Sequence, residues 1–201
     1  MKQRDWTGNA RSAHAILGAR NYAQNEREAN DYYATDPRAV ELLLEQETFS
    51  PYIWEPACGE GHMSKVLKAH GYDVKSTDLI DRGYGTGGVD FLEYEDSELI
   101  NADVVTNPPY RHAQAFVEKA LSLVAPGHKV AMFLKIQFLE GKARRALFDQ
   151  YPPQTVYVSS GRLRCAMNGD FERYAKSNAI CYAWFVWQKG HLGPTNIKWI
   201  N

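Results

Sequence analysis

The sequence contains the stretch Tyr52-Ile53-Trp54-Glu55-Pro56-Ala57-Cys58-Gly59-Glu60-Gly61, in which a short apolar run leads into a turn with two glycines. A helical pattern of apolar residues follows, and Gly71 closes it. A strand, a glycine-containing turn and a helix in this order are typical of the start of a βαβ unit. The stretch therefore predicts an α/β protein with a mostly parallel sheet.

The same alternation extends in both directions from this unit. Asp36 and Pro37 are suited to begin a helix, which we expect over 36–48. Further strands are predicted at 72–77, near Val89, and at 103–106, 129–135, 154–158 and 179–188, with helices over 113–124 and 139–148. The sheet thus has seven expected strands. The last two are too close in sequence for a long crossover helix, so we expect an antiparallel hairpin at one edge.

Length and composition predict one globular domain. The chain has 201 residues, of which 44% are hydrophobic and 23% are charged, so it has enough apolar side chains for a sizeable core. Residues 1–30 are polar and small, with spaced arginines, and we expect a weakly structured N-terminal arm there. Residues 31–201 then form the single domain.

The charges are divided unevenly along the chain. The formal net charge is −1, but residues 1–107 carry 10 Lys and Arg against 19 Asp and Glu, whereas residues 108–201 carry 13 against 5. Asymmetry of this kind indicates a polyanionic partner on one side of the protein.

Several other classes of protein are disfavoured. The three cysteines have no C-x-x-C spacing, so neither a disulfide framework nor a zinc site is indicated. His62, His112 and His128 lack metal-ligand spacing and are expected at the surface or in packing. No apolar stretch is long enough for a membrane span, and no export signal is visible. We therefore expect a cytoplasmic protein with no metal and no membrane partner.

Three features stand at predicted strand ends, where ligands bind in open α/β sheets. The turn from Glu55 to Gly61 lets the backbone approach a ligand closely. Asp78 is placed to accept hydrogen bonds from ribose hydroxyls, Asp90 could accept from an adenine amino group, and Phe91 could stack on that base. Simpler interpretations stay open, because such a turn can merely connect a strand to a helix, an aspartate can cap a helix, and a phenylalanine can belong to the core.

The turn itself favours a nucleoside without phosphates. The third glycine of the dinucleotide fingerprint is missing, because Ser64 stands in its place. Glu55 and Glu60 also suit an ammonium or sulfonium group better than a pyrophosphate, which prefers bare backbone amides.

The sequence Asn107-Pro108-Pro109-Tyr110 directly follows a predicted buried strand. The two prolines end that strand and hold the Pro108 carbonyl in one direction. The side-chain oxygen of Asn107 and this carbonyl then present two acceptors beside an aromatic ring. Two acceptors on the hydrogens of a conjugated amino group favour a pyramidal nitrogen, whose lone pair can attack an activated methyl group. The ring of Tyr110 can stack on a planar substrate, and a base within a duplex must first be flipped out.

Taken in order, these motifs resemble those of S-adenosylmethionine-dependent amino-methyltransferases, most closely the adenine-specific (N6) DNA methyltransferases. The segment from Asp31 to Pro37 is similar to the motif that precedes the cofactor turn in part of that group. The stretches Leu17 to Asn21 and Glu26 to Glu28 resemble small phage-type members. The resemblance implies a Rossmann-like class I methyltransferase fold, S-adenosyl-L-methionine as the cofactor and DNA as the partner.

The resemblance also implies roles for individual residues. The methionine part of the cofactor would lie against Tyr33, Thr35, Glu55, Pro56, Ala57, Cys58, Gly59 and Gly61, its ribose against Asp78, and its adenine against Asp90 and Phe91. The catalytic residues that engage the target base would be Asn107, Pro108, Pro109 and Tyr110, with Asn107 also beside the cofactor.

Larger members of that group carry a separate target-recognition domain, and no segment here is long enough to be one. Recognition is then expected to be short or relaxed, or to come from the arm and the loop 159–178. In that loop we expect phosphate contacts from Arg162, Arg164, Arg173 and Lys176. A second candidate patch consists of Lys142, Arg144 and Arg145, although a solvated helix face explains this second cluster equally well.

Other functions are compatible with the same residues. The two acceptors and the aromatic ring of Asn107, Pro108 and Tyr110, which we call the clamp, suit any planar amino or amide nitrogen. An RNA adenine methyltransferase and a protein glutamine methyltransferase therefore stay open. Glutamine methyltransferases of the release-factor type usually add an N-terminal helical domain, which is not evident here. A non-catalytic nucleic-acid-binding module on the same fold is the alternative from another class. We expect a monomer, with a dimer as the alternative.

Overall fold

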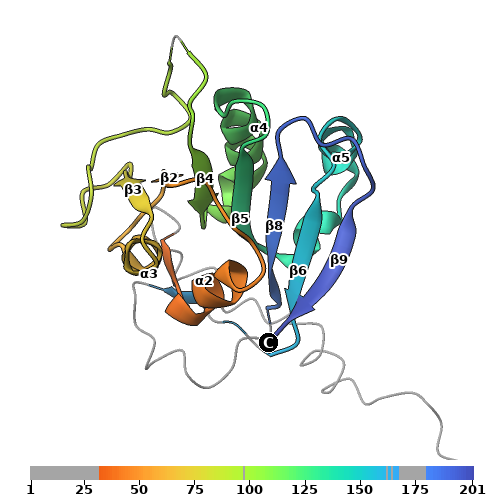
Figure 1. Cartoon of the computed structure of the whole chain (residues 1–201), viewed down its shortest axis with the longest axis horizontal. Helices are drawn as coiled ribbons and strands as arrows, with labels where there is room; N and C mark the ends of the chain where they lie inside the picture. The colour runs from red at the N-terminus through yellow and green to blue at the C-terminus, as the bar shows by residue number, and fades with distance from the viewer. Residues whose placement is uncertain (1–31, 97, 162, 164, 168–179) are drawn as a thin grey trace, which may run out of the picture.

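The computed structural model describes residues 32–96, 98–161, 163, 165–167 and 180–201 (Figure 1). The predicted arm over 1–30 lies outside the described residues. In the described part of the chain, no helix is long and apolar enough to cross a membrane.

A seven-stranded sheet forms the centre of the domain (Figure 1). Its strand order is β3-β2-β4-β5-β8-β6-β9. The bounds are β2 (Tyr52–Glu55), β3 (Asp73–Ser76), β4 (Asp103–Thr106), β5 (Lys129–Lys135), β6 (Thr155–Ser159), β8 (Tyr182–Gln188) and β9 (Asn196–Ile200). Strand β8 is antiparallel to both of its neighbours, and all the other neighbouring strands are parallel.

Helices cover both faces of this sheet (Figure 1). Helices α2 (Pro37–Leu44) and α3 (His62–Ala69) pack on one face, and α4 (Ala113–Leu123) and α5 (Arg145–Gln150) pack on the other. Successive side chains of a strand point to opposite faces, so Ile53 belongs to the first core layer and Trp54 to the second. Both layers consist mainly of buried apolar side chains, as expected for a parallel sheet that is covered on both faces.

Helix α2 begins as predicted and ends earlier. The Asp36 side chain accepts a hydrogen bond from the backbone N–H of Arg38 at 3.0 Å, and Pro37 occupies the first helical turn. The helix ends at Leu44 instead of 48, and the Glu47 carboxylate beyond it accepts hydrogen bonds from Lys129 and from the Tyr157 hydroxyl. These contacts connect the end of α2 to the sheet.

The predicted strands agree with the structure except at one position. The strands expected at 103–106 and 129–135 are confirmed to the residue. The expected final hairpin is present as the antiparallel pair β6 and β8, although the edge itself is formed by β9. The strand expected near Val89 is wrong. There the chain runs as a loop beside β3, in which Thr86 bridges Thr77 and the N–H of Val89 donates to the carbonyl of Asp78. The seventh strand is instead β9, which joins the sheet beside β6 and was not predicted.

The helix expected over 139–148 is interrupted. Gly141 has a φ of 111°, which a continuous helix cannot contain. Two short 3-10 turns, η2 (Ile136–Leu139) and η3 (Lys142–Arg144), therefore precede the shorter helix α5. A third, η1 (Tyr110–His112), leads into α4.

The sequence patterns also did not predict a second sheet, which has two strands. Strand β1 (Tyr33–Thr35) pairs antiparallel with β7 (Cys165–Met167), and Thr35 is opposite Cys165. This pair brings the start of the domain and the segment after β6 to the carboxyl end of β4, which positions the site.

Candidate active site

A cavity of about 220 Å³ lies at the carboxyl ends of β2, β3 and β4. This is the location expected for a ligand site in an open α/β sheet. The cavity lining includes the predicted residues Tyr33, Thr35, Glu55, Pro56, Ala57, Cys58, Asp78, Asp90, Phe91, Asn107, Pro108, Pro109 and Tyr110. Gly59 and Gly61 shape the turn and are not among the lining residues.

The turn after β2 depends on its two glycines. Gly59 and Gly61 have φ angles of 54° and 77°, in the left-handed region that favours glycine. A Cβ at Gly59 would lie 2.3 Å from the ring of Tyr32, and one at Gly61 would lie 2.4 Å from the ring of Tyr84. Two tyrosine rings therefore pack directly on the turn, which leaves no space for larger residues.

Asp78 supports the same turn from the next strand. One of its carboxylate oxygens accepts from the N–H of Gly59 at 2.8 Å, and the other accepts from the N–H of Ile80 at 2.9 Å. Each oxygen has two lone pairs, so both can still accept from a ligand hydroxyl. Asp78 thus orders the turn and borders the cavity.

Glu55 places a buried carboxyl group at the wall of the cavity. It accepts a hydrogen bond from the hydroxyl of Ser64, which also contacts the hydroxyl of Ser76 at 2.7 Å. Burial, and to a smaller extent the nearby charge of Asp78, raises the pKa of Glu55 to about 8. The carboxyl group is therefore mostly protonated at neutral pH, and a cation bound beside it would favour its ionised form.

Asp90 and Phe91 lie in the wall of the cavity and also make contacts that support the fold. One carboxylate oxygen of Asp90 accepts from the N–H of Leu92 at 2.9 Å, and Phe91 is only 2% exposed. The ring of Phe91 packs edge-on against Trp54 and tilted against Phe116, with centroid distances of 5.1 and 4.9 Å. Phe91 is thus a core residue, as its simpler interpretation expects, whereas Asp90 holds a turn and does not cap a helix. Both residues also border the cavity.

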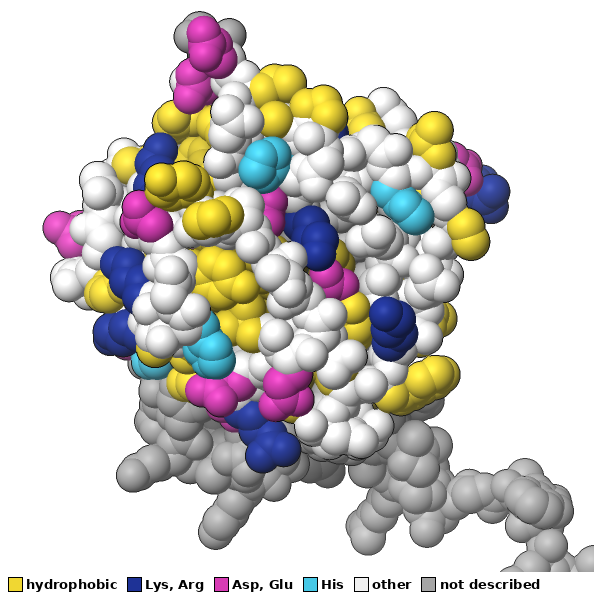
Figure 2. Space-filling view, viewed as in Figure 1, with side chains coloured by type: hydrophobic (Ala, Val, Ile, Leu, Met, Phe, Trp, Pro, Cys, Tyr) yellow, Lys and Arg dark blue, Asp and Glu magenta, His cyan; other side chains and the backbone are white. Residues whose placement is uncertain are grey.

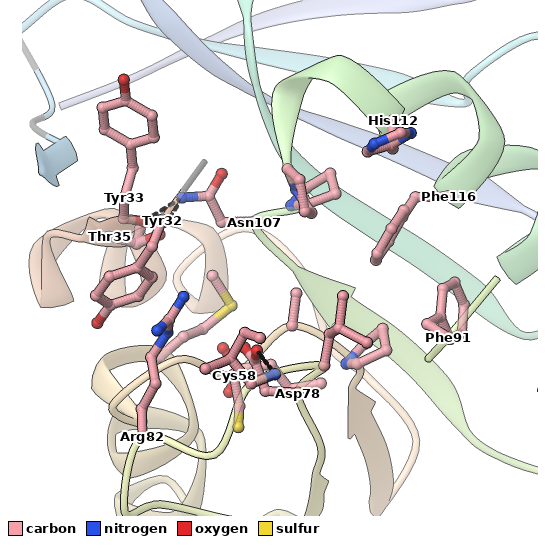
Figure 3. Close-up of a pocket in the computed structure, with 18 of the residues that line it drawn as sticks. Tyr32, Tyr33, Thr35, Cys58, Asp78, Arg82, Phe91, Asn107, His112 and Phe116 are labelled. Atoms are coloured by element: carbon pink, nitrogen blue, oxygen red, sulfur yellow. Dashed lines mark hydrogen bonds between the residues drawn. The ribbon is translucent and has the colours of Figure 1, made fainter. Parts of the chain in front are cut away.

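The amide of Asn107 has a definite orientation (Figure 3). Its Nδ2 donates to the carbonyl of Tyr33 and to Oγ1 of Thr35, both at 2.9 Å. A carbonyl can only accept, so the amide nitrogen must be the atom that faces Tyr33. The opposite atom, Oδ1, is buried and has no hydrogen-bond partner among the described residues. The site therefore contains a directed acceptor to which no described residue donates.

Tyr110 is held beside this amide. Its hydroxyl lies 3.2 Å from Sγ of Cys165, and its ring packs against Tyr33 and Tyr182. Lys135 Nζ lies 4.6 Å from the centroid of the ring. Burial raises the pKa of the Tyr110 hydroxyl well above its usual value, so this group stays neutral.

Solved structures of the same architecture are known, although sequence comparison finds no relative: no family model and no curated protein matches the sequence. A Listeria monocytogenes protein provisionally described as a class I S-adenosylmethionine-dependent methyltransferase superposes with a TM-score of 0.58 at 12% identity, over 94% of this chain and 71% of its own. The 23S rRNA methyltransferase ErmE has a TM-score of 0.56 at 16% identity, over 81% of this chain and 71% of its own. This chain has the class I methyltransferase fold.

A third similar structure is a chain from a type I R-M system. It has a TM-score of 0.56 and 17% identity, over 95% of this chain and 48% of its own. The proteins with this fold are thus described in different terms, as methyltransferases and as part of an R-M system. At these identities the similarity defines the fold, and the function must be argued from the site.

The structure adds residues to this methyltransferase-fold site that the sequence motifs do not single out. Tyr32, Arg82, His112 and Phe116 line the cavity, and Cys165 contacts Asn107 and Tyr110. His62 also lines it, although we expected it, like His112, only at the surface or in packing. Tyr32 could have been found, because it lies within the segment from Asp31 to Pro37 that carries part of the resemblance. No local pattern marks Cys165, which is 58 residues from Asn107.

The proposed nucleic-acid-binding residues Arg162, Arg164, Arg173 and Lys176 lie outside the described residues. In the second candidate patch, the Arg144 guanidinium donates to backbone carbonyls, including that of Phe138, and Arg145 pairs with Asp149 at 2.7 Å. These contacts favour the solvated-helix interpretation of that cluster. Figure 2 shows positive and negative side chains interspersed over the described part of one face. The described residues contain no group of three or more His, Cys, Asp or Glu side chains that could hold a metal ion.

Proposed function

We propose that the protein is an S-adenosylmethionine-dependent methyltransferase that modifies the exocyclic amino group of adenine in DNA. The observation that carries this proposal is the amide of Asn107. Its Nδ2 is occupied by Tyr33 and Thr35, and its buried Oδ1 lacks a partner among the described residues. An unpaired buried acceptor is costly, so this atom is suited to accept from a substrate N–H group.

An amino group is a better fit for this acceptor than a hydroxyl group. The Pro108 carbonyl follows Asn107 directly and supplies a second acceptor, so both hydrogens of an NH₂ group could be bound. The adenine amino group is a weak nucleophile because its lone pair is delocalised into the ring. Hydrogen bonds to both hydrogens favour a pyramidal nitrogen, and the lone pair becomes available for in-line attack.

The rest of the cavity fits S-adenosylmethionine. Asp78 has lone pairs available for ribose hydroxyls, and Asp90 with Phe91 offers an acceptor and an apolar edge for the adenine. Glu55 can pair with the ammonium group. When bound, the cofactor supplies an electrophilic methyl group on a sulfonium. The methylated amino group is at first cationic and loses its proton to water, so no general base is required.

Two observations favour DNA as the substrate. The order of the strand-end motifs resembles that of adenine-specific DNA methyltransferases, and a similar structure belongs to a type I R-M system. The excess of positive charge in residues 108–201, together with the basic loop 159–178, supports a polyanionic partner. The likeness to an rRNA methyltransferase supports RNA adenine as the second candidate.

The proposal is tested by incubating the protein with methyl-labelled S-adenosylmethionine and unmethylated DNA, RNA or glutamine peptide. We expect N6-methyladenine in the DNA, detected by mass spectrometry. Label in RNA or peptide alone would redirect the assignment, and no label in any substrate would contradict it.

Two variants separate the two halves of the site. Asn107→Ala should abolish turnover and change cofactor affinity by less than about threefold, because it removes the acceptor for the target amino group. Asp78→Ala should weaken cofactor binding by about tenfold or more, measured by calorimetry. Equal loss of cofactor binding in both variants would mean that Asn107 is not the clamp.

A further inference from the structure

Arg82 borders the cavity and has no role in the reaction described above. It is the one Lys or Arg side chain among the described residues that line the cavity. The carboxyl groups of Glu55, Asp78 and Asp90 line the same space. In the described part of the chain, Arg82 forms no ion pair with any of them.

The guanidinium of Arg82 is held close to the glycine turn (Figure 3). It lies 4.4 Å from the centroid of the Tyr32 ring, and that ring packs on Gly59. The Tyr32 hydroxyl also accepts from the N–H of Glu60 at 3.3 Å. Arg82 therefore lies at the part of the cavity where we place the methionine part of the cofactor, and not at the clamp after β4.

The polar atoms of Arg82 are incompletely satisfied. Its Nε is buried and has no hydrogen-bond partner among the described residues. The planar fork of a guanidinium matches the two oxygens of a carboxylate, and such pairs are among the strong hydrogen bonds of proteins. A cation beside a cavity whose Nε receives no acceptor from the described residues is thus suited to an anionic group of the ligand.

S-adenosylmethionine carries one such group, the carboxylate of its methionine part. Glu55, Asp78 and Asp90 suit the ammonium, hydroxyl and amino groups of the cofactor, but none of these acidic groups can attract its carboxylate. We propose that Arg82 binds this carboxylate and so makes the site selective for the intact amino-acid end of the cofactor. This inference rests on the proposed use of S-adenosylmethionine and names the residue that recognises its anionic end.

Calorimetry with two ligands tests this role. Decarboxylated S-adenosylmethionine lacks the carboxylate and retains the rest of the cofactor. We expect Arg82→Gln to weaken binding of S-adenosylmethionine by about 10- to 100-fold, because a charge-assisted pair is lost. Binding of the decarboxylated ligand should stay unchanged or become tighter, because the variant removes a positive charge near a more cationic ligand. Arg82→Lys should give an intermediate affinity for S-adenosylmethionine.

A matched control separates this effect from net charge. Lys65→Gln removes the same charge, but Lys65 is outside the cavity lining and its Nζ donates to the carbonyl of Glu60. The Lys65→Gln variant should bind both ligands as the unmodified protein does.

Three results would overturn the inference. Equal weakening of both ligands by Arg82→Gln would show that Arg82 acts through the shape of the turn. Unchanged cofactor binding with weaker DNA binding would show that Arg82 holds a phosphate of the target. If the unmodified protein bound neither ligand, the proposed function would fail together with this inference, whereas the first two results leave the proposed function intact.

Discussion

The carboxyl group of Glu55 is buried and forms no ion pair among the described residues, and its ionisation is coupled to folding. Burial is the largest cause of its raised pKa, about 8, against 4.5 for an exposed glutamate. The hydrogen bond from Ser64 opposes this shift only in part. The folded protein thus retains a proton on Glu55 at pH values where the unfolded chain has lost it.

The pH dependence of stability follows from this difference. A group with a raised folded-state pKa stabilises the fold fully below its unfolded pKa, and this contribution is lost as the pH rises through the folded pKa. The melting temperature of the unmodified protein should therefore fall, relative to that of Glu55→Gln, between about pH 5 and pH 8. Thermal melts of both proteins at several pH values measure this, and parallel curves would contradict the assigned pKa shift.

At the scale of elements, the turn between β2 and α3 combines two separate constraints. Gly61 has a left-handed backbone and also lies under the ring of Tyr84. Gly71, with a φ of 90°, is different, because a Cβ added there would meet no atom within 4 Å. Gly61 is therefore required both by its left-handed backbone conformation and by the lack of space under the Tyr84 ring. Gly71 is required by its backbone conformation alone.

Alanine substitutions at these two glycines separate the constraints. Gly71→Ala should lower the free energy of unfolding by about 1 kcal/mol, the cost of a left-handed alanine. Gly61→Ala should cost clearly more, because the ring of Tyr84 must also move, and it should weaken cofactor binding. Urea unfolding and calorimetry measure the two effects, and equal losses of stability would mean that the ring moves freely.

At the scale of the whole molecule, charge separates the proposed cofactor half from the proposed DNA half. The acidic half of the sequence contains the cavity carboxyl groups of Glu55, Asp78 and Asp90, whereas the basic half begins after Asn107. The charge boundary in the sequence thus coincides with the proposed meeting point of methyl group and base.

This division of charge predicts how DNA binding depends on salt concentration. Replacing Arg162 and Arg164 with alanine should reduce the slope of log K against log salt by about 1 for each phosphate contact that is lost, and should leave cofactor affinity unchanged. Arg145→Ala is the matched control, because Arg145 already pairs with Asp149 on α5. DNA titrations at several salt concentrations measure the slope, and equal slopes in all variants would argue against phosphate contacts from these arginines.

Local pattern alone was enough to predict most of the architecture. The alternation of strands and helices, the glycine turn after β2 and the proline stop after β4 depend on neighbouring residues, so each was predictable from the sequence. Where a local pattern was ambiguous, as near Val89 and across Gly141, the prediction was wrong. Near Val89 the chain forms a loop that bridges to the residues just after β3, and at Gly141 the backbone angle of one glycine interrupts the helix.

Local sequence patterns were thus sufficient to predict the alternation of strands and helices and to identify the residues at the strand ends. How these residues face one another depends on the folded chain. The Asn107 amide is oriented by Tyr33 and Thr35, which are 74 and 72 residues away, and Arg82 is held at the turn by the ring of Tyr32. Periodicity and turn chemistry act over a few residues, whereas these contacts require the chain to close long loops and pair β1 with β7. For this reason, the acceptor of Asn107 and the donor of Arg82 that no described residue satisfies become visible only after folding.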